Sequence, residues 1–152
     1  MKKRRLGQKG FTLGELVVII AIVFAIVVLL EPFARDIRAR SERVECANNI
    51  RELGKALYLY AKEHQGKFPG TLEILYKEKY LGDVRFVDCP ATKHVGTPEE
   101  PEYSYKGELS VNDPSQGILL RDGEGSHRNG ANMLLVDGEI LWQAEARSGA
   151  GR

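Results

Sequence analysis

Two cysteines have the widest choice of chemistry in this sequence, because a pair of thiols can form a disulfide or bind a metal ion. A zinc site drawn from Cys46, Cys89, His94 and His127 would have suitable ligand types. The C-x-x-C and H-x-x-x-H spacings typical of zinc sites are missing, however, so the sequence does not favour zinc. We prefer a Cys46–Cys89 disulfide over two free thiols, provided that both residues lie in an oxidising compartment.

An acidic, glycine-rich loop is the second candidate site. Asp122, Glu124 and Ser126 place oxygen ligands at alternate positions, as calcium-binding loops do. No EF-hand spacing follows, and an exposed acidic turn has the same composition. The exposed turn is therefore the preferred interpretation, with calcium as the alternative; no other cofactor is expected.

His127 could be a ligand or a partner-contact residue. A lone histidine without clustered partners is weak support for a site, so a structural role is preferred, in which His127 bonds a neighbouring loop or turn and holds the following hairpin against a helix. The sequence contains no nucleophile elbow, phosphate loop or zinc-peptidase motif. We therefore do not expect an enzyme.

Glu15 stands at the edge of a long apolar stretch. Fifteen uninterrupted apolar residues, Leu16 to Leu30, follow it, and residues 11–30 supply the roughly 20 that span a bilayer. An ionised carboxylate there costs about 2.5–3.5 kcal/mol unless it is paired. No residue of the segment is expected to pair with Glu15, so its partner should come from a chain end or another molecule.

The charges around this stretch predict its orientation. Five basic residues precede it within the first ten, and their charge should stay cytoplasmic, which places the rest of the chain, with both cysteines, on the outer side. Without these ten residues the chain has 17 basic and 21 acidic residues, a net charge of −4. That balance does not favour a nucleic-acid-binding surface.

The elements that would position these residues are a long helix and a small sheet. Residues 33–64 read as helix beyond Pro32, which could kink it, and one stripe at spacings of three and four should be buried: Cys46, Ile50, Leu53, Leu57, Tyr60 and His64. Further along, the sequence predicts a short helix over 72–81 with Tyr76 on its inner face, an extended piece at 85–87 and an exposed loop at 91–102.

The last third of the chain predicts β-structure. Strands are expected at 103–105, 117–121, 131–136 and 139–142, and Asp137-Gly138 has the chemistry of a two-residue type I′ turn. Such short strands cannot bury a core alone, so we expect the sheet to cover the helical stripe. The predicted fold class is α+β, with a long N-terminal helix packed against a small antiparallel sheet.

The start of the chain resembles the processing site of type IV prepilins and type II secretion pseudopilins. Gly10 is followed by F-T-L-G-E-L-V, between a basic leader and an apolar stretch; Gly14 departs from the family, which usually has a branched apolar residue there. The resemblance implies a pilin-like fold, cleavage after Gly10 by prepilin peptidase and N-methylation of Phe11. It also implies that Glu15 neutralises the amine of a neighbouring subunit during filament assembly.

A second resemblance extends over most of the chain, to a pilin subgroup said to carry a prepilin-type processing-associated domain. The matching residues are Cys46, Asn48-Asn49, Phe68-Pro69, Cys89-Pro90, and His127 nine residues before Asp137-Gly138. Related sequences often have a second histidine directly after Asp-Gly, where this chain has Glu139. That difference further weakens a metal site based on a histidine pair.

Together these patterns predict a leader (1–10), a transmembrane assembly helix (11–31), its amphipathic continuation (32–66), an α/β head (67–143) and a tail (144–152). The expected function is a structural subunit of a type IV pilus or type II secretion filament. The expected partners are other filament subunits, prepilin peptidase and an inner-membrane assembly platform. Before processing, the chain would cross the inner membrane once with a cytoplasmic N-terminus, and its head would be periplasmic or extracellular. A minor pilin with a binding head and a tethered, non-polymerising domain remain alternatives.

Overall fold

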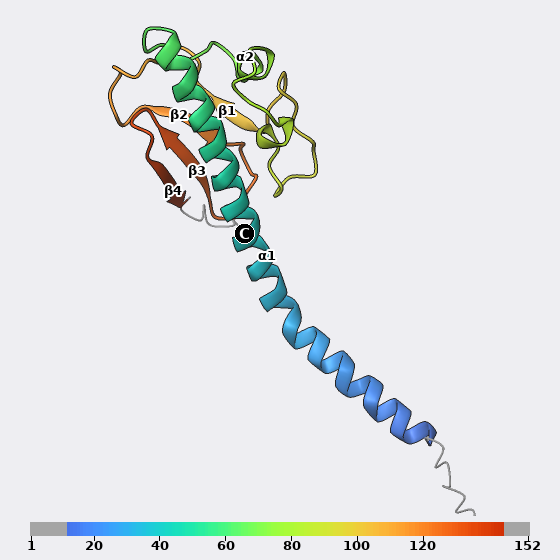
Figure 1. Cartoon of the computed structure of the whole chain (residues 1–152). Helices are drawn as coiled ribbons and strands as arrows, with labels where there is room; N and C mark the ends of the chain where they lie inside the picture. The colour runs from blue at the N-terminus through green and yellow to red at the C-terminus, as the bar shows by residue number, and fades with distance from the viewer. Residues whose placement is uncertain (1–11, 145–152) are drawn as a thin grey trace, which may run out of the picture. The chain divides into compact units, whose positions relative to one another are not determined.

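The structure, a computed structural model, describes residues 12–144. Gly10 and Phe11, the predicted leader and all but the first residue of the predicted tail therefore lie outside the described residues. The described chain forms, in order, α1 (Leu13–Glu63), α2 (Leu72–Lys77), the 3-10 helix η1 (Val84–Val87), β1 (Tyr103–Tyr105), β2 (Ile118–Asp122), β3 (Gly130–Leu135) and β4 (Ile140–Ala144) (Figure 1). It divides into two compact units between Ile37 and Arg38, and α1 runs through both.

The first unit is the N-terminal part of α1. This part is long and apolar enough to cross a membrane, judged by length and composition, and its apolar window is wholly exposed. Pro32 lies inside the helix without ending it, although it cannot donate the usual backbone hydrogen bond.

The first turn of α1 corrects the expectation that no residue of the segment pairs with Glu15. The Glu15 carboxylate accepts hydrogen bonds from the Thr12 backbone N–H at 2.8 Å and the Thr12 hydroxyl at 2.9 Å. In return, the Glu15 N–H donates to the Thr12 hydroxyl oxygen at 3.3 Å. This is a capping box, in which a threonine before the helix and a glutamate three residues later satisfy free N–H groups reciprocally.

The second unit, from Arg38 on, contains the rest of α1, the sheet and the connecting loops. The predicted stripe of α1 is buried from Cys46 to Leu57 and half-buried at Tyr60 and His64, whose rings stack 3.7 Å apart. Gly54 is also buried, and a Cβ there would lie 3.1 Å from the Leu134 side chain of β3. This glycine lets the helix and the sheet approach closely, and the predicted α+β packing is confirmed.

The sheet is an antiparallel meander in the order β1-β2-β3-β4. All six residues of β3, the strand between β2 and β4, are buried. The register of β2 against β3 shifts between Ile118 and Leu120, and Leu119 and Leu120 are both fully buried. An extra residue of this kind interrupts the alternation of faces along a strand, which explains two consecutive buried leucines.

The β3–β4 hairpin forms as predicted, but its turn differs from the predicted two-residue type I′ turn. Gly138 donates to the Leu135 carbonyl at 3.0 Å, and Leu135 donates to the Glu139 carbonyl at 2.9 Å, so three residues form the loop. Gly138 has φ +89°, whereas Asp137 is not among the residues with positive φ. A type I′ turn needs positive φ at both central residues; the observed loop has a single left-handed residue, as three-residue hairpin loops do.

Replacing Gly138 with alanine should destabilise the second unit, because an L-residue in this left-handed conformation costs about 1–2 kcal/mol. Gly82→Ala is the control: a Cβ at Gly82 meets no atom within 4 Å, and we expect a change within about 0.5 kcal/mol. Denaturant unfolding followed by the fluorescence of Trp142, the single tryptophan, measures both. Equal stabilities of the two variants would contradict this account of the turn.

Three smaller expectations are corrected. The helix predicted over 72–81 ends at Lys77, and Lys79 has φ +65°, which no helix accommodates. Tyr76, expected on its inner face, is 45% exposed. The piece predicted as extended at 85–87 belongs to η1, where the Asp83 carboxylate accepts a hydrogen bond from the Arg85 N–H at 2.9 Å.

Candidate functional site

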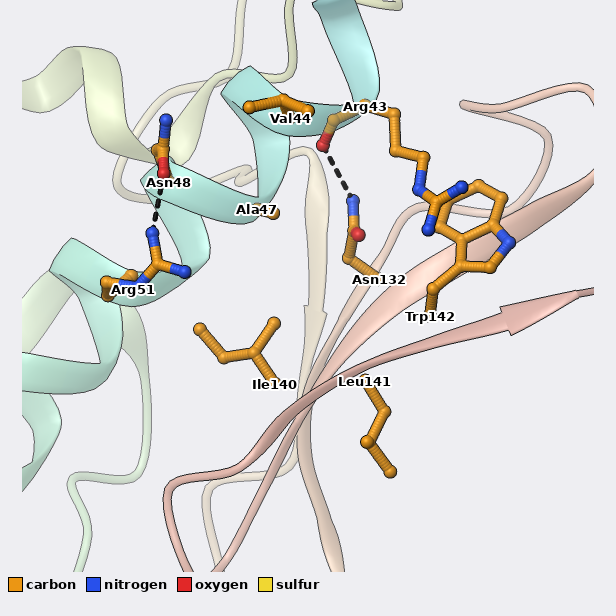
Figure 2. A pocket seen from close by; sticks show the side chains of 9 residues that line it. All are labelled: Arg43, Val44, Ala47, Asn48, Arg51, Asn132, Ile140, Leu141 and Trp142. Atoms are coloured by element: carbon orange, nitrogen blue, oxygen red, sulfur yellow. Dashed lines mark hydrogen bonds between the residues drawn. The ribbon is translucent and has the colours of Figure 1, made fainter. Parts of the chain in front are cut away.

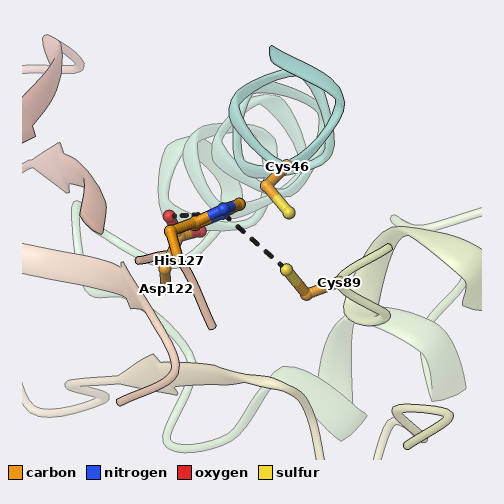
Figure 3. A group of neighbouring side chains, drawn as sticks. All are labelled: Cys46, Cys89, Asp122 and His127. Atoms are coloured by element: carbon orange, nitrogen blue, oxygen red, sulfur yellow. Dashed lines mark hydrogen bonds and ion pairs between the residues drawn. The ribbon is translucent and has the colours of Figure 1, made fainter. Parts of the chain in front are cut away.

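Four side chains that are distant in sequence converge in the second unit. They are Cys46 on α1, Cys89 just after η1, Asp122 at the end of β2 and His127 in the β2–β3 loop (Figure 3). One sulfur, nitrogen or carboxylate oxygen from each lies within 4.8 Å of all the others. We call this group the thiol–imidazole cluster.

The thiol–imidazole cluster is closed to solvent and internally bonded. His127 Nε2 lies 3.2 Å from Asp122 Oδ2 and 4.0 Å from Cys89 Sγ. The two thiols lie side by side, with their sulfurs no more than 4.8 Å apart. Cys46, Cys89 and Asp122 are each at most 2% exposed, and the His127 side chain is 5% exposed. A nucleophilic role is not supported, because a substrate has no access to these groups.

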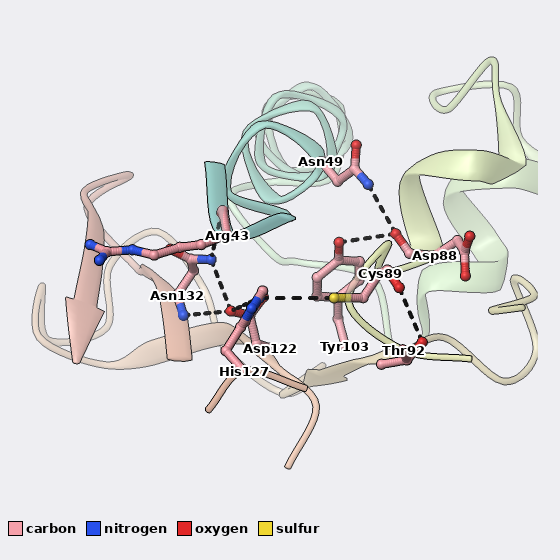
Figure 4. A network of polar contacts seen from close by, with 9 residues as sticks. All are labelled: Arg43, Asn49, Asp88, Cys89, Thr92, Tyr103, Asp122, His127 and Asn132. Atoms are coloured by element: carbon pink, nitrogen blue, oxygen red, sulfur yellow. Dashed lines mark hydrogen bonds and ion pairs between the residues drawn. The ribbon is translucent and has the colours of Figure 1, made fainter. Parts of the chain in front are cut away.

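Two elements hold Cys89 beside Cys46. The carbonyl of the preceding residue, Asp88, accepts hydrogen bonds from the Asn49 amide of α1 at 2.9 Å and from the Tyr103 hydroxyl of β1 at 3.1 Å (Figure 4). Because Asn49 lies one turn beyond Cys46 on α1, the same helix supplies one thiol and positions the other. The Cys89 carbonyl in turn accepts from the Thr92 hydroxyl and N–H, both at 3.0 Å.

Asn132 of β3 holds the carboxylate of Asp122. Its backbone N–H and its amide both donate to Asp122 Oδ2, at 2.6 and 2.9 Å, and the amide also donates to the Arg43 carbonyl of α1 at 3.1 Å. The other oxygen, Asp122 Oδ1, is buried and has no hydrogen-bond partner among the described residues. Asn132 therefore fixes Asp122 Oδ2, whereas Asp122 Oδ1 remains an unused acceptor among the described residues.

His127 is bounded on one side by Trp142 of β4, whose ring lies edge-on at 5.8 Å. The Arg43 guanidinium stacks 3.7 Å above the same indole. Arg43 and Trp142 also line a shallow hollow of about 320 Å³ between α1 and the sheet (Figure 2). A second arginine of this hollow, Arg51, donates to the Asn48 side chain at 2.5 Å. The hollow is thus basic and aromatic, but both arginines are engaged within the chain.

The surroundings shift the ionisation of the cluster. Burial raises the pKa of the Asp122 carboxyl, against the opposing effect of the hydrogen bonds from Asn132. The thiol–thiol hydrogen bond raises the pKa of Cys46 and lowers the pKa of Cys89. The Ala91 backbone N–H donates to both sulfurs and favours the thiolate in each.

The structure brings the two cysteines together, as the sequence predicted, but as two buried free thiols and not as the preferred disulfide. The zinc set weighed from the sequence contained His94, which is exposed and lies outside the cluster, while Asp122 takes the fourth place. Sequence reasoning missed this because motif spacings describe ligands close together along the chain. These four ligands meet only through the packing of helix, loop and sheet.

An exposed turn was preferred for the loop that contains Asp122, Glu124 and Ser126, with calcium binding as the alternative, but only Glu124 of the three is exposed. Asp122 is buried against His127 and Asn132, whereas Glu124 is exposed. Ser126 contacts the Cys89 side chain. The three predicted ligands therefore lie in different surroundings.

His127 was expected to bond a neighbouring loop or the hairpin turn, and the structure shows the first: its Nε2 lies 4.0 Å from Cys89 Sγ in the loop after η1. His127 lies before β3 and Asp137-Gly138 lies after it, at opposite ends of that strand. At the turn it is Tyr58 of α1 that bonds, donating to the Val136 carbonyl. The nine-residue interval between the histidine and Asp-Gly thus corresponds to one strand and its flanking residues.

Comparisons with family models, curated proteins and solved structures return no match for this chain.

Proposed function

We propose that this chain is a structural subunit of a type IV pilin-like or pseudopilin filament, processed after Gly10 and anchored in the inner membrane before assembly. The prepilin-like run from Gly10 to Val17 motivates the proposal. The observation that carries it is the continuity of α1: one helix has a glutamate in its first turn, passes through an apolar stretch that could cross a membrane, and then contributes its buried face to the core of an α+β unit.

The position of Glu15 supports the same proposal. It is the acidic residue of the first turn of α1, directly before the fifteen apolar residues. The Thr12 hydrogen bonds satisfy this carboxylate but do not neutralise its charge, and an ionised group in lipid is unfavourable without a partner of opposite charge. In a filament, the amine of a neighbouring subunit would be that partner, and prepilin peptidase and an inner-membrane assembly platform would be the other partners.

Processing after Gly10 tests the proposal directly. We expect mass spectrometry of the protein extracted from membranes of its native host to find a chain that begins at N-methylated Phe11. A Gly10→Val variant should keep its leader. Gly14→Ala is the matched control, since a Cβ at Gly14 meets no atom within 4 Å, and it should be processed like the parent chain. An intact leader in the parent chain, or a first residue beyond Leu30, would overturn the proposal.

A further inference from the structure

We propose that Cys46, Cys89, Asp122 and His127 bind one Zn²⁺ ion in a closed structural site within the second unit. The proposal is independent of filament assembly, because all four residues belong to this unit. The bound ion would link α1, the loop after η1 and the β2–β3 region of the sheet through the thiol–imidazole cluster.

The geometry fits a tetrahedral ion. Zinc lies about 2.3 Å from sulfur and about 2.0–2.2 Å from nitrogen or oxygen, so the ligand atoms of a tetrahedral site lie about 3.3–3.8 Å apart. Here Nε2 of His127 is 3.2 Å from Asp122 Oδ2 and 4.0 Å from Cys89 Sγ, and the whole set is within 4.8 Å. Side-chain movements of about 1 Å would complete the site.

The donor set selects the metal. Two sulfurs, one imidazole nitrogen and one carboxylate oxygen suit zinc, whereas calcium and magnesium prefer oxygen ligands only. Four protein ligands with little exposure leave no open position, which is typical of structural and not catalytic zinc. Common iron–sulfur clusters are held by four cysteines, and this chain has only two.

The charges and hydrogen bonds around the cluster support a cation. A buried carboxylate is costly unless it is paired and its acceptors are satisfied, and Asp122 Oδ1 has no hydrogen-bond partner among the described residues. Asn132 fixes the other oxygen through its backbone N–H and its amide. Such second contacts orient ligands in metal sites, and their loss typically weakens metal binding 10–100-fold.

The competing arrangement is a Cys46–Cys89 disulfide beside the contact between Asp122 and His127. The two arrangements exclude each other, since a disulfide removes both sulfur ligands. They also differ in composition. The zinc site contains a metal ion, and its two cysteines can be alkylated after acid release of the metal. The disulfide arrangement contains no metal ion and no alkylatable cysteine.

The test uses the full chain, purified in detergent from host membranes without chelators or reductant. We expect about one zinc per chain by elemental mass spectrometry, with both cysteines alkylatable after acid release. Exchange with Co²⁺ should give thiolate-to-cobalt charge-transfer absorption and the intense visible bands of a tetrahedral site. A chain with a disulfide and no zinc, or a reduced chain that gives no such cobalt spectrum, would overturn the proposal.

Matched variants assign the ligands. His127→Gln and Asp122→Asn should bind zinc at least about 100-fold more weakly than the parent chain, since loss of a ligand exceeds loss of a second contact. The controls His94→Gln and Glu124→Gln change an exposed imidazole and an exposed carboxylate and should bind like the parent. Unchanged binding in His127→Gln or Asp122→Asn would overturn the assignment. If either variant fails to fold, the cobalt spectrum of the parent chain decides.

Discussion

Replacing Glu15 with glutamine is expected to abolish filament assembly while leaving the start of α1 intact. Glutamine serves as well as glutamate in a capping box, so the bonds with Thr12 can persist. The charge that would neutralise a neighbouring subunit's amine is lost. The variant should therefore be processed and inserted normally but should not polymerise, and electron microscopy of host cells together with fractionation of sheared filaments measures this.

Thr12→Val is the control that separates the two roles of Glu15. It removes the hydroxyl and weakens the start of α1 by about 1 kcal/mol, but it keeps the carboxylate. We expect filaments from Thr12→Val. Normal filaments from Glu15→Gln would show that the charge is not needed for assembly. Equal loss in both variants would assign Glu15 to the helix start alone.

Replacing Leu57 with alanine should destabilise the second unit by about 2–5 kcal/mol, because the substitution leaves a cavity in a packed core. Leu57 of α1 is fully buried in the hydrophobic core. The loss is a large share of the roughly 5–15 kcal/mol that stabilises a typical domain. Denaturant unfolding of the full chain in detergent, followed by Trp142 fluorescence, measures it.

Leu59 provides the control on the same helix. Its side chain is 48% exposed, and Leu59→Ala should change the free energy of unfolding by no more than about 0.5 kcal/mol. The two variants differ only in which face of α1 loses its leucine. Similar losses in both would show that the buried stripe does not hold the helix against the sheet.

The elements of the fold could be predicted because each has a local signal. The three- and four-residue spacing from Cys46 to Leu57 indicated a helix with one buried face, and alternation with turn residues located the strands. The same signals did not give the turn type at Asp137-Gly138, because the pair suits either a two-residue turn or a longer loop with one left-handed residue.

The candidate site could be predicted only in part. Cys46 and Cys89 were expected to meet, because a buried helical thiol needs a partner segment nearby. Asp122 was expected in an exposed acidic turn, with calcium binding as the alternative, since its neighbours in sequence are acidic and small. Its true neighbours, His127 and Asn132, are set by the end of β2 and by the register of β3. Local sequence does not show which face of a strand end a carboxylate will occupy.

The role of Thr12 was overlooked for a different reason. The T-x-x-E pattern of a capping box is present in the sequence, but a carboxylate beside an apolar stretch suggests a charged partner and not a neutral one. The structure shows that neutral donors of the first turn satisfy the carboxylate.

The sheet order has a consequence for how the chain is made. Four residues join β3 to β4 and seven join β2 to β3, whereas the bonds that attach α1 to the sheet join residues 78 and 89 positions apart. Short-range pairings form faster than long-range ones, and the ribosome releases the N-terminal part first. The apolar face of α1 therefore stays exposed until nearly the whole chain has been synthesised. Packing of the sheet onto this face is the step that completes folding.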